Sequence, residues 1–141
     1  MARLIEDVVM KITRAQSLTS TLASSDTFTG RVRMETLFSN EAPARTKGAY
    51  VTFDPSARTF WHTHPLGQTI IITHGSGRVQ RWGGPVEIVS IGDVVFFEPH
   101  EKHWHGGGLE TAMTHLTVGE VLDGKSADWL EEVTDQQYRG G

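Results

Sequence analysis

The chain has 141 residues, a formal net charge of −4 and no cysteine. A chain of this length forms one domain with a core of its own. Acidic and basic residues are interspersed, with no basic block that could follow a phosphate backbone, and the longest apolar runs are far shorter than the roughly 20 residues that cross a bilayer, so we expect neither nucleic acid nor a membrane as a partner.

The distribution of glycines along the chain predicts an all-β domain. Fifteen glycines separate short runs rich in Val, Ile, Phe and Thr, as is typical of many short strands joined by tight turns. Residues 1–30 predict an N-terminal arm or edge strand, residues 31–122 a β-barrel, and residues 123–141 a helical tail. Acidic residues near the N-terminus do not fit a secretory signal, and with no cysteine present a cytoplasmic location is expected.

Alternation of apolar and polar residues defines the predicted strands. They span residues 32–34, 49–53, 58–64, 68–74, 78–82, 85–89, 94–97 and 111–118. Residues 75–77 are a predicted turn, the pair 78–82 and 85–89 a hairpin, and residues 106–108 a flexible link. In the tail, residues 126–133 predict a short helix with Ser126 as N-cap, and residues 134–137 have the form of a capping box.

Two histidines one residue apart, His62 and His64, predict a metal site. On a strand, residues i and i+2 project from the same face, so both imidazoles can meet one ion. A second cluster follows about forty residues later and contains His100, His103 and His105. Imidazole suits zinc, iron, nickel or copper, and an added amide or water oxygen would also suit manganese, whereas the absence of cysteine excludes a thiolate site.

The spacing of these residues resembles the cupin superfamily. Its first motif is matched at His62, His64, Gln68 and Gly75, with Ser56 where the motif has Gly and Gln68 where it has Glu. The second motif aligns with Gly92, Glu98, His100, His103 and Gly107, of which only Gly92 and His103 match by identity. The resemblance implies a double-stranded β-helix, a jelly-roll barrel with a short C-terminal helix, and one divalent metal held by His62, His64, Gln68 and His103.

Within that superfamily the chain resembles small bacterial manganese-dependent (R)-selective hydroxynitrile lyases. The likeness runs from Met10 to Arg139 and includes Trp61-His62-Thr63-His64-Pro65-Leu66-Gly67-Gln68, Glu101-Lys102-His103-Trp104-His105 and Thr111-Ala112-Met113-Thr114-His115. It implies reversible cleavage of a cyanohydrin to an aldehyde and cyanide, with the metal as Lewis acid and His115 as general base. Two residues depart from the group: His74 replaces a small residue, and Gly119 replaces a glutamine that lines the pocket.

Several assignments follow from the predicted strand faces. Residues expected to form the pocket wall are Ala49, Val51, Phe53, Phe60, Phe97 and Met113, and the resemblance adds Gly119. If Gln68 points into the barrel, alternation along the strand makes His74 point inward as well. A structural role is favoured for His105 because the motif selects His103, and His100 is expected on a solvent-facing turn.

Two other functions fit the same ligands. An iron cupin could act as a dioxygenase, and a metal cupin could bind or isomerise sugars or sugar acids. Neutral ligands do not choose among manganese, iron, zinc and nickel, and it is the family resemblance that favours manganese. The resemblance further implies a small-molecule substrate and a homo-oligomer, a dimer or a tetramer.

Overall fold

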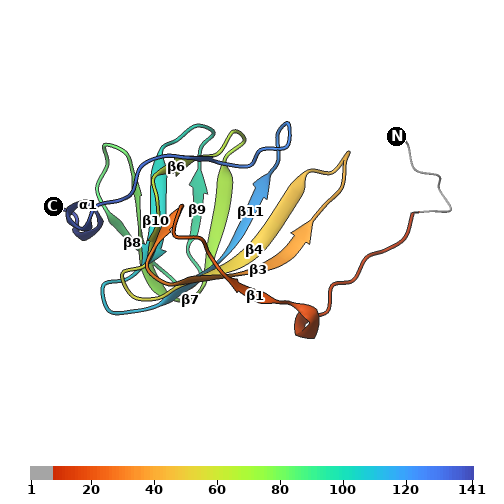
Figure 1. Cartoon of the computed structure of the whole chain (residues 1–141), viewed down its shortest axis with the longest axis horizontal. Helices are drawn as coiled ribbons and strands as arrows, with labels where there is room; N and C mark the ends of the chain where they lie inside the picture. Colours follow the sequence, from red (N-terminus) through yellow and green to blue (C-terminus); the bar gives the residue numbers. More distant parts are fainter. Residues whose placement is uncertain (1–7) are drawn as a thin grey trace.

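The computed structural model describes residues 8–141 and is an all-β barrel with a short C-terminal helix, as predicted (Figure 1). The strands are β1 (Ser20–Leu22), β2 (Phe28–Thr29), β3 (Val32–Ser39), β4 (Thr46–Phe53), β5 (Arg58–Thr59), β6 (His62–Thr63), β7 (Gln68–Arg81), β8 (Glu87–Ser90), β9 (Val94–Phe97), β10 (His103–Gly107), β11 (Met113–Glu120) and β12 (Asp128–Trp129). A 3-10 turn, η2, spans Ala15–Ser17, and α1 spans Asp135–Arg139.

The strands form one curled sheet in the order β1-β3-β4-β11-β7-β10-β5-β2. The long strand β7 joins the two parts of this sheet, because its first half pairs with β11 and β9 and its second half with β10 and β8. The predicted turn at residues 75–77 is therefore wrong, since β7 runs through it. Gly75 has φ +67°, and a side chain there would collide with the carbonyl of Ala112, so glycine allows β7 to bend without ending.

A β-bulge corrects the expected direction of His74. The register between β7 and β11 shifts between Thr114 and His115, so that His115 faces Ile72 while Thr114 faces His74. A bulge reverses the faces on which the following side chains project. Gln68 consequently points into the cavity described below, whereas His74 is exposed on the outside.

The predicted strand over residues 58–64 is broken in two. The chain bends at Phe60 and Trp61 between β5 and β6. Trp61 is 2% exposed and belongs to a second core with Trp104, Val133 and Tyr138, the last of which comes from α1. Phe60 lies in this break and is not among the residues that line the cavity described below, so its expected place in the pocket wall is wrong.

The tail differs from the predicted helix over residues 126–133. Asp128 and Trp129 instead pair with Thr63 and His62, which gives the edge of β6 a hydrogen-bonded neighbour. The predicted capping box is confirmed, because Thr134 accepts from the backbone N–H of Gln137 while the Gln137 side chain accepts from the N–H of Thr134. In Figure 1 the segment after β11 runs back over the barrel to α1.

The predicted flexible link at residues 106–108 is instead buried and ordered. Gly106 and Gly107 belong to β10, and a side chain on Gly106 would collide with the carbonyl of Ala57 and with Arg58. These glycines let β10 approach the β5 segment closely. The main core fills the interior beside them and includes Val51, Phe53, Ile70, Ile72, Phe97 and Met113.

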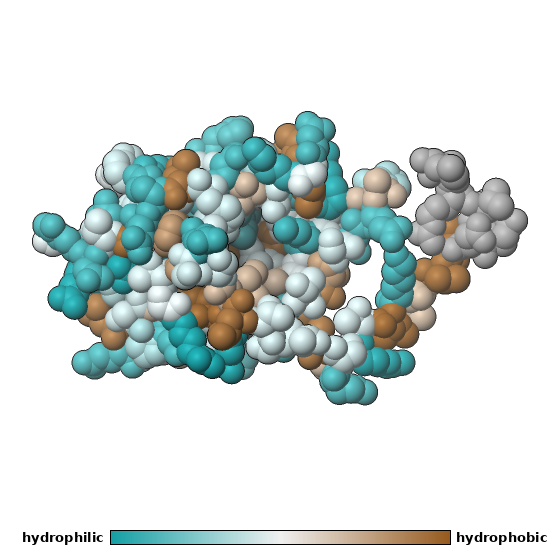
Figure 2. Space-filling view, in the orientation of Figure 1, coloured by the Kyte–Doolittle hydropathy of each residue, from teal (hydrophilic) through white to brown (hydrophobic). Residues whose placement is uncertain are grey.

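The described N-terminal segment stands away from the barrel and carries exposed apolar side chains (Figure 2). Val8, Val9, Met10 and Ile12 are exposed, and β1 then pairs with β3 at the edge of the sheet. The expected homo-oligomer stays a prediction. Within residues 8–141 we find no helix with the length and apolar character that a membrane span requires.

Candidate metal centre and active site

Three histidines from two neighbouring strands converge at one end of the barrel. His62 lies in β6, His64 follows it, and His103 opens β10 directly opposite His62 in the antiparallel register. One ligand nitrogen from each of the three lies within 4.8 Å of the others. A single divalent ion could therefore contact all three, and these are the three histidines that the first and second motifs select.

Backbone carbonyls orient each of these rings. The Nδ1 atom of His62 lies 2.8 Å from the carbonyl oxygen of Phe60, that of His64 lies 2.7 Å from Ser126, and that of His103 lies 2.8 Å from Glu101. A carbonyl can only accept, so each Nδ1 carries the proton and each Nε2 presents a lone pair. Metal-binding histidines are typically held in this way.

The remaining donor atoms fit a metal rather than a hydrogen-bond network. The Nε2 atoms of His64 and His103 and the Oε1 atom of Gln68 are buried, and none has a hydrogen-bond partner among residues 8–141. Buried polar atoms without partners are costly and rare. A divalent ion held by three neutral imidazoles and one amide oxygen would satisfy them, so the residues present fit the metal that the cupin motifs imply.

Burial keeps these imidazoles neutral. It lowers the pKa of His62 well below its usual range, with His103 and His64 as further causes, and it lowers the pKa of His103 to about 3. The pKa of His64 is also lowered, first by burial, and is partly restored by the carbonyl of Ser126. Neutral imidazole is the form that binds metal, so the site is ready to coordinate at neutral pH.

Two further histidines form a buried pair beside the ligands. His115 in β11 and His105 in β10 are 0% and 4% exposed, and Nε2 of His115 lies 3.0 Å from Nδ1 of His105. Burial lowers the pKa of both, to about 3 for His115. Phe97 stacks on His103 at 3.6 Å between ring centroids and also lies against His105, so the ligand and the pair share one wall.

A cavity of about 210 Å³ opens on this centre. It is lined by His62, His64, Gln68 and His105, together with Phe28, Met34, Lys47, Val51, Thr59, Ser126, Ala127 and Trp129. Trp129 stacks on His62 with 4.5 Å between ring centroids. The cavity thus pairs metal-ligating atoms with an apolar wall, as small-molecule sites do.

The residues expected to form the pocket wall are dispersed. Val51 lines the cavity, whereas Phe53, Phe97 and Met113 lie deeper in the main core, where Phe53 packs on His115 and Phe97 on His103. Ala49 lines a separate hollow on β3 and β4, and Gly119 lies opposite Lys47 and Gln68 in β11. His115 is behind His105 and is not among the side chains that line the cavity.

The sequence reasoning missed several residues that the structure brings to the cavity. His105 was set aside by the motif spacing, although it shares one strand face with His103 at i+2. Lys47 alternates with Ala49 and Val51 and could have been placed on their face. No local signal places Phe28 or Trp129, since both arrive through pairing of distant segments, Phe28 with Thr59 and Trp129 with His62.

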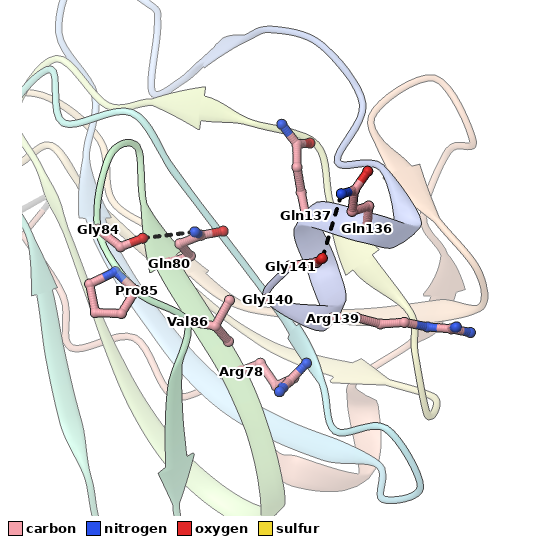
Figure 3. Close-up of a pocket in the computed structure, with 10 residues that line it drawn as sticks. All are labelled: Arg78, Gln80, Gly84, Pro85, Val86, Gln136, Gln137, Arg139, Gly140 and Gly141. Atoms are coloured by element: carbon pink, nitrogen blue, oxygen red, sulfur yellow. Dashed lines mark hydrogen bonds between the residues drawn. The ribbon is translucent and has the colours of Figure 1, made fainter.

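A larger hollow of about 590 Å³ lies between α1 and the β7–β8 hairpin (Figure 3). It contains none of the histidines. Two of its polar side chains are engaged within the fold, because Arg78 donates to the carbonyl of Tyr138 and Gln80 donates to that of Gly84. The smaller cavity at the histidine cluster is therefore the candidate active site.

The comparisons with known proteins agree with the fold and the motifs. The family model described as "Cupin domain" matches residues 49–119. A cupin-like protein of Thermotoga maritima with a solved structure is 39% identical, covers 84% of this chain and 90% of its own, and superposes with a TM-score of 0.80. The chain belongs to the cupin family.

A more similar relative carries a functional name. (R)-mandelonitrile lyase of Granulicella tundricola is 58% identical over 130 residues, which cover 92% of this chain and 99% of the relative. The predicted family resemblance is thereby confirmed. The polyketide cyclase RemF of Streptomyces resistomycificus superposes with a TM-score of 0.71 at 17% identity, covers 93% of this chain and 92% of its own, and shares the fold alone.

Proposed function

We propose that the protein is a metal-dependent hydroxynitrile lyase that cleaves and forms cyanohydrins such as mandelonitrile. The single observation that carries the proposal is the meeting of three histidines, each with its Nδ1 atom held by a backbone carbonyl, with a buried histidine pair next to one cavity that has an apolar wall. The 58% identity to (R)-mandelonitrile lyase supports it.

The expected metal is manganese, held by His62, His64, Gln68 and His103. When bound, the ion supplies Lewis acidity toward an oxygen of the substrate. The neutral ligand set leaves the charge of the ion uncompensated, which favours that role. The aromatic ring of mandelonitrile would lie against the apolar wall formed by Phe28, Met34, Val51 and Trp129.

The base is the pair formed by His105 and His115. His105 lines the cavity and His115 lies behind it, so we assign the first proton transfer to Nε2 of His105. His115 then stabilises the protonated His105 through the hydrogen bond between the two rings. This refines the expectation that His115 acts alone. For Nε2 of His105 to accept, its Nδ1 must donate to Nε2 of His115, which fixes the tautomer of both rings.

The reaction balances with these groups. The hydroxyl proton of the cyanohydrin moves to His105, the carbon–oxygen bond becomes the carbonyl of the aldehyde, and the bond to the nitrile carbon breaks with its electron pair on cyanide. Cyanide then takes the proton and leaves as hydrogen cyanide. Because burial lowers the pKa of both imidazoles, both are neutral at neutral pH, and Nε2 of His105 presents a free lone pair to the hydroxyl proton.

The test measures metal content and cyanide release together. Purified protein is analysed for bound metals, stripped, reloaded separately with manganese, iron, zinc or nickel, and supplied with mandelonitrile without oxygen. We expect the manganese form to release benzaldehyde and cyanide in equal amounts and to favour the (R) enantiomer. Failure of all four metal forms to release cyanide above the metal-free control would refute the proposal.

Oxygen distinguishes the alternative functions. An iron dioxygenase would need oxygen and would consume it during turnover, whereas the lyase reaction would not. Binding of sugars or sugar acids, with no cyanide released by any metal form, would instead support a carbohydrate cupin.

A further inference from the structure

Lys47 projects toward the candidate active site. In β4 the side chains of Lys47, Ala49 and Val51 lie on one face, and Lys47 lines the cavity together with His64 and Gln68. In the register of the sheet Lys47 lies opposite Gly119 of β11, which has no side chain, and Gly119 in turn lies opposite Gln68. The lysine therefore reaches the mouth of the cavity on the side where Gln68 enters it.

The charge of Lys47 is not used within the described fold. The chain has four lysines, and Lys11, Lys102 and Lys125 each lie within ion-pair distance of a carboxylate. Among residues 8–141, Lys47 has no carboxylate partner within 4.0 Å. A lysine at a pocket mouth without such a partner is available to an anion from solution or from the reaction.

Lys47 brings a positive charge to the cavity wall that His64 and Gln68 share. An ammonium group at that position attracts a negative charge inside the cavity. Geometry and charge therefore agree on an anion position between Lys47 and the ligand histidines.

We propose that Lys47 stabilises the negative charge that develops on cyanide as it leaves the cyanohydrin carbon, and that it binds cyanide in the reverse reaction. The inference rests on the proposed function. As the bond to the nitrile carbon breaks, its electron pair passes to cyanide while His105 holds the hydroxyl proton. The substrate is neutral and the leaving group is an anion, so the ammonium interacts more strongly in the transition state than in the bound substrate.

The kinetic test uses Lys47→Met, which keeps the length of the side chain and removes its charge. We expect kcat for mandelonitrile cleavage to fall about tenfold with little change in KM, less than the loss of a fully buried oxyanion donor because Lys47 is exposed to water. Lys47→Arg should retain most of the activity. Lys11→Met, an exposed lysine on the N-terminal segment, is the matched control and should equal the unmodified protein.

A binding test separates failure of this inference from failure of the proposed function. Thiocyanate, a linear ion that stays charged, and acetonitrile, a neutral linear molecule, are titrated into manganese-loaded protein and followed by tryptophan fluorescence, since Trp129 lines the cavity. We expect Lys47→Met to weaken thiocyanate binding severalfold, and acetonitrile binding to be the same in both proteins.

The outcomes are distinct. Equal kcat in Lys47→Met and the unmodified protein overturns the inference. If the unmodified protein releases no cyanide, the proposed function fails, and thiocyanate binding alone tests the anion site. Weaker thiocyanate binding in Lys47→Met supports an anion site at Lys47, and unchanged binding overturns it.

Discussion

The Nε2 atom of His115 and the Nδ1 atom of His105 lie 3.0 Å apart inside the barrel. Two imidazoles can share a hydrogen bond only if one of the two nitrogens carries a proton and the other accepts it. Phe53 contacts both rings, and Phe97 covers His105, so water has little access to the pair. The two rings therefore act as one unit, with a single route for a proton from the cavity to His115.

Removing either member of the pair should disable the same step. We expect His105→Ala and His115→Ala each to lower kcat by about 10² to 10⁴, and the double variant to lose no more than the worse single variant. Steady-state kinetics on manganese-loaded protein, with metal content measured in parallel, checks this. The exposed His74→Ala is the control. Losses that multiply in the double variant would contradict a shared step.

Burial of His115 predicts a pH-dependent stability. Its pKa is about 3 in the folded protein against 6.5 for an ordinary histidine. Between these values the unfolded chain binds the proton and the folded one does not, so the stabilisation is complete above about pH 6.5 and is lost as the pH falls toward 3. For each such proton, the free energy of unfolding of the metal-free protein should decrease by about 1.4 kcal/mol for every unit by which the pH is lowered in this range.

Urea unfolding at several pH values between 4 and 7 measures this slope. In His115→Gln the free energy of unfolding should change less steeply with pH, by the contribution of one proton. Some slope remains because the other buried histidines still contribute. An identical slope in the variant and the unmodified protein would show that His115 is not held neutral by the fold.

The barrel and three ligands could be predicted because their signals are local. His62 and His64 share a strand face whatever the rest of the chain does, and the motif spacing adds His103. The same local reasoning gave the wrong face for His74, since a β-bulge depends on the partner strand and leaves no sign in the alternation. It also predicted a helix over residues 126–133, where pairing with β6 overrides helix propensity.

The cavity was harder to predict than the ligands because its walls come from distant segments. Phe28 reaches it through β2, which pairs with β5, and Trp129 through β12, which pairs with β6. Neither segment carries a motif, and two-residue strands are too short to show periodicity. The motif also directed attention to His103 and away from His105, although alternation along β10 makes the two neighbours on one face.

Tyr138 fixes the tail to the barrel, and removal of the Tyr138 side chain should destabilise the fold. The hydroxyl of Tyr138 donates to the carbonyl of Gly107 at 2.7 Å, and the ring lies against Trp104 and under the guanidinium of Arg58. We expect Tyr138→Phe to cost about 1 kcal/mol for the hydrogen bond. Tyr138→Ala should cost about 3 to 5 kcal/mol, because it also leaves a cavity.

Urea unfolding of the two variants and of Gln136→Ala checks this. Gln136 is an exposed neighbour on the same helix, and its variant should differ from the unmodified protein by less than about 0.5 kcal/mol. A Tyr138→Ala protein as stable as the Gln136→Ala control would mean that α1 contributes nothing to the barrel.

Trp129 and Leu130 are neighbours in the tail with similar exposure, 41% and 43%, but only Trp129 lines the cavity. Because its ring stacks on His62 and packs on Phe28, it forms an aromatic wall suited to a planar substituent. Trp129→Ala should therefore raise KM for mandelonitrile about tenfold and change KM for an aliphatic cyanohydrin much less, whereas Leu130→Ala should alter neither. Equal effects of Trp129→Ala on both substrates would place the aromatic ring of mandelonitrile elsewhere in the cavity.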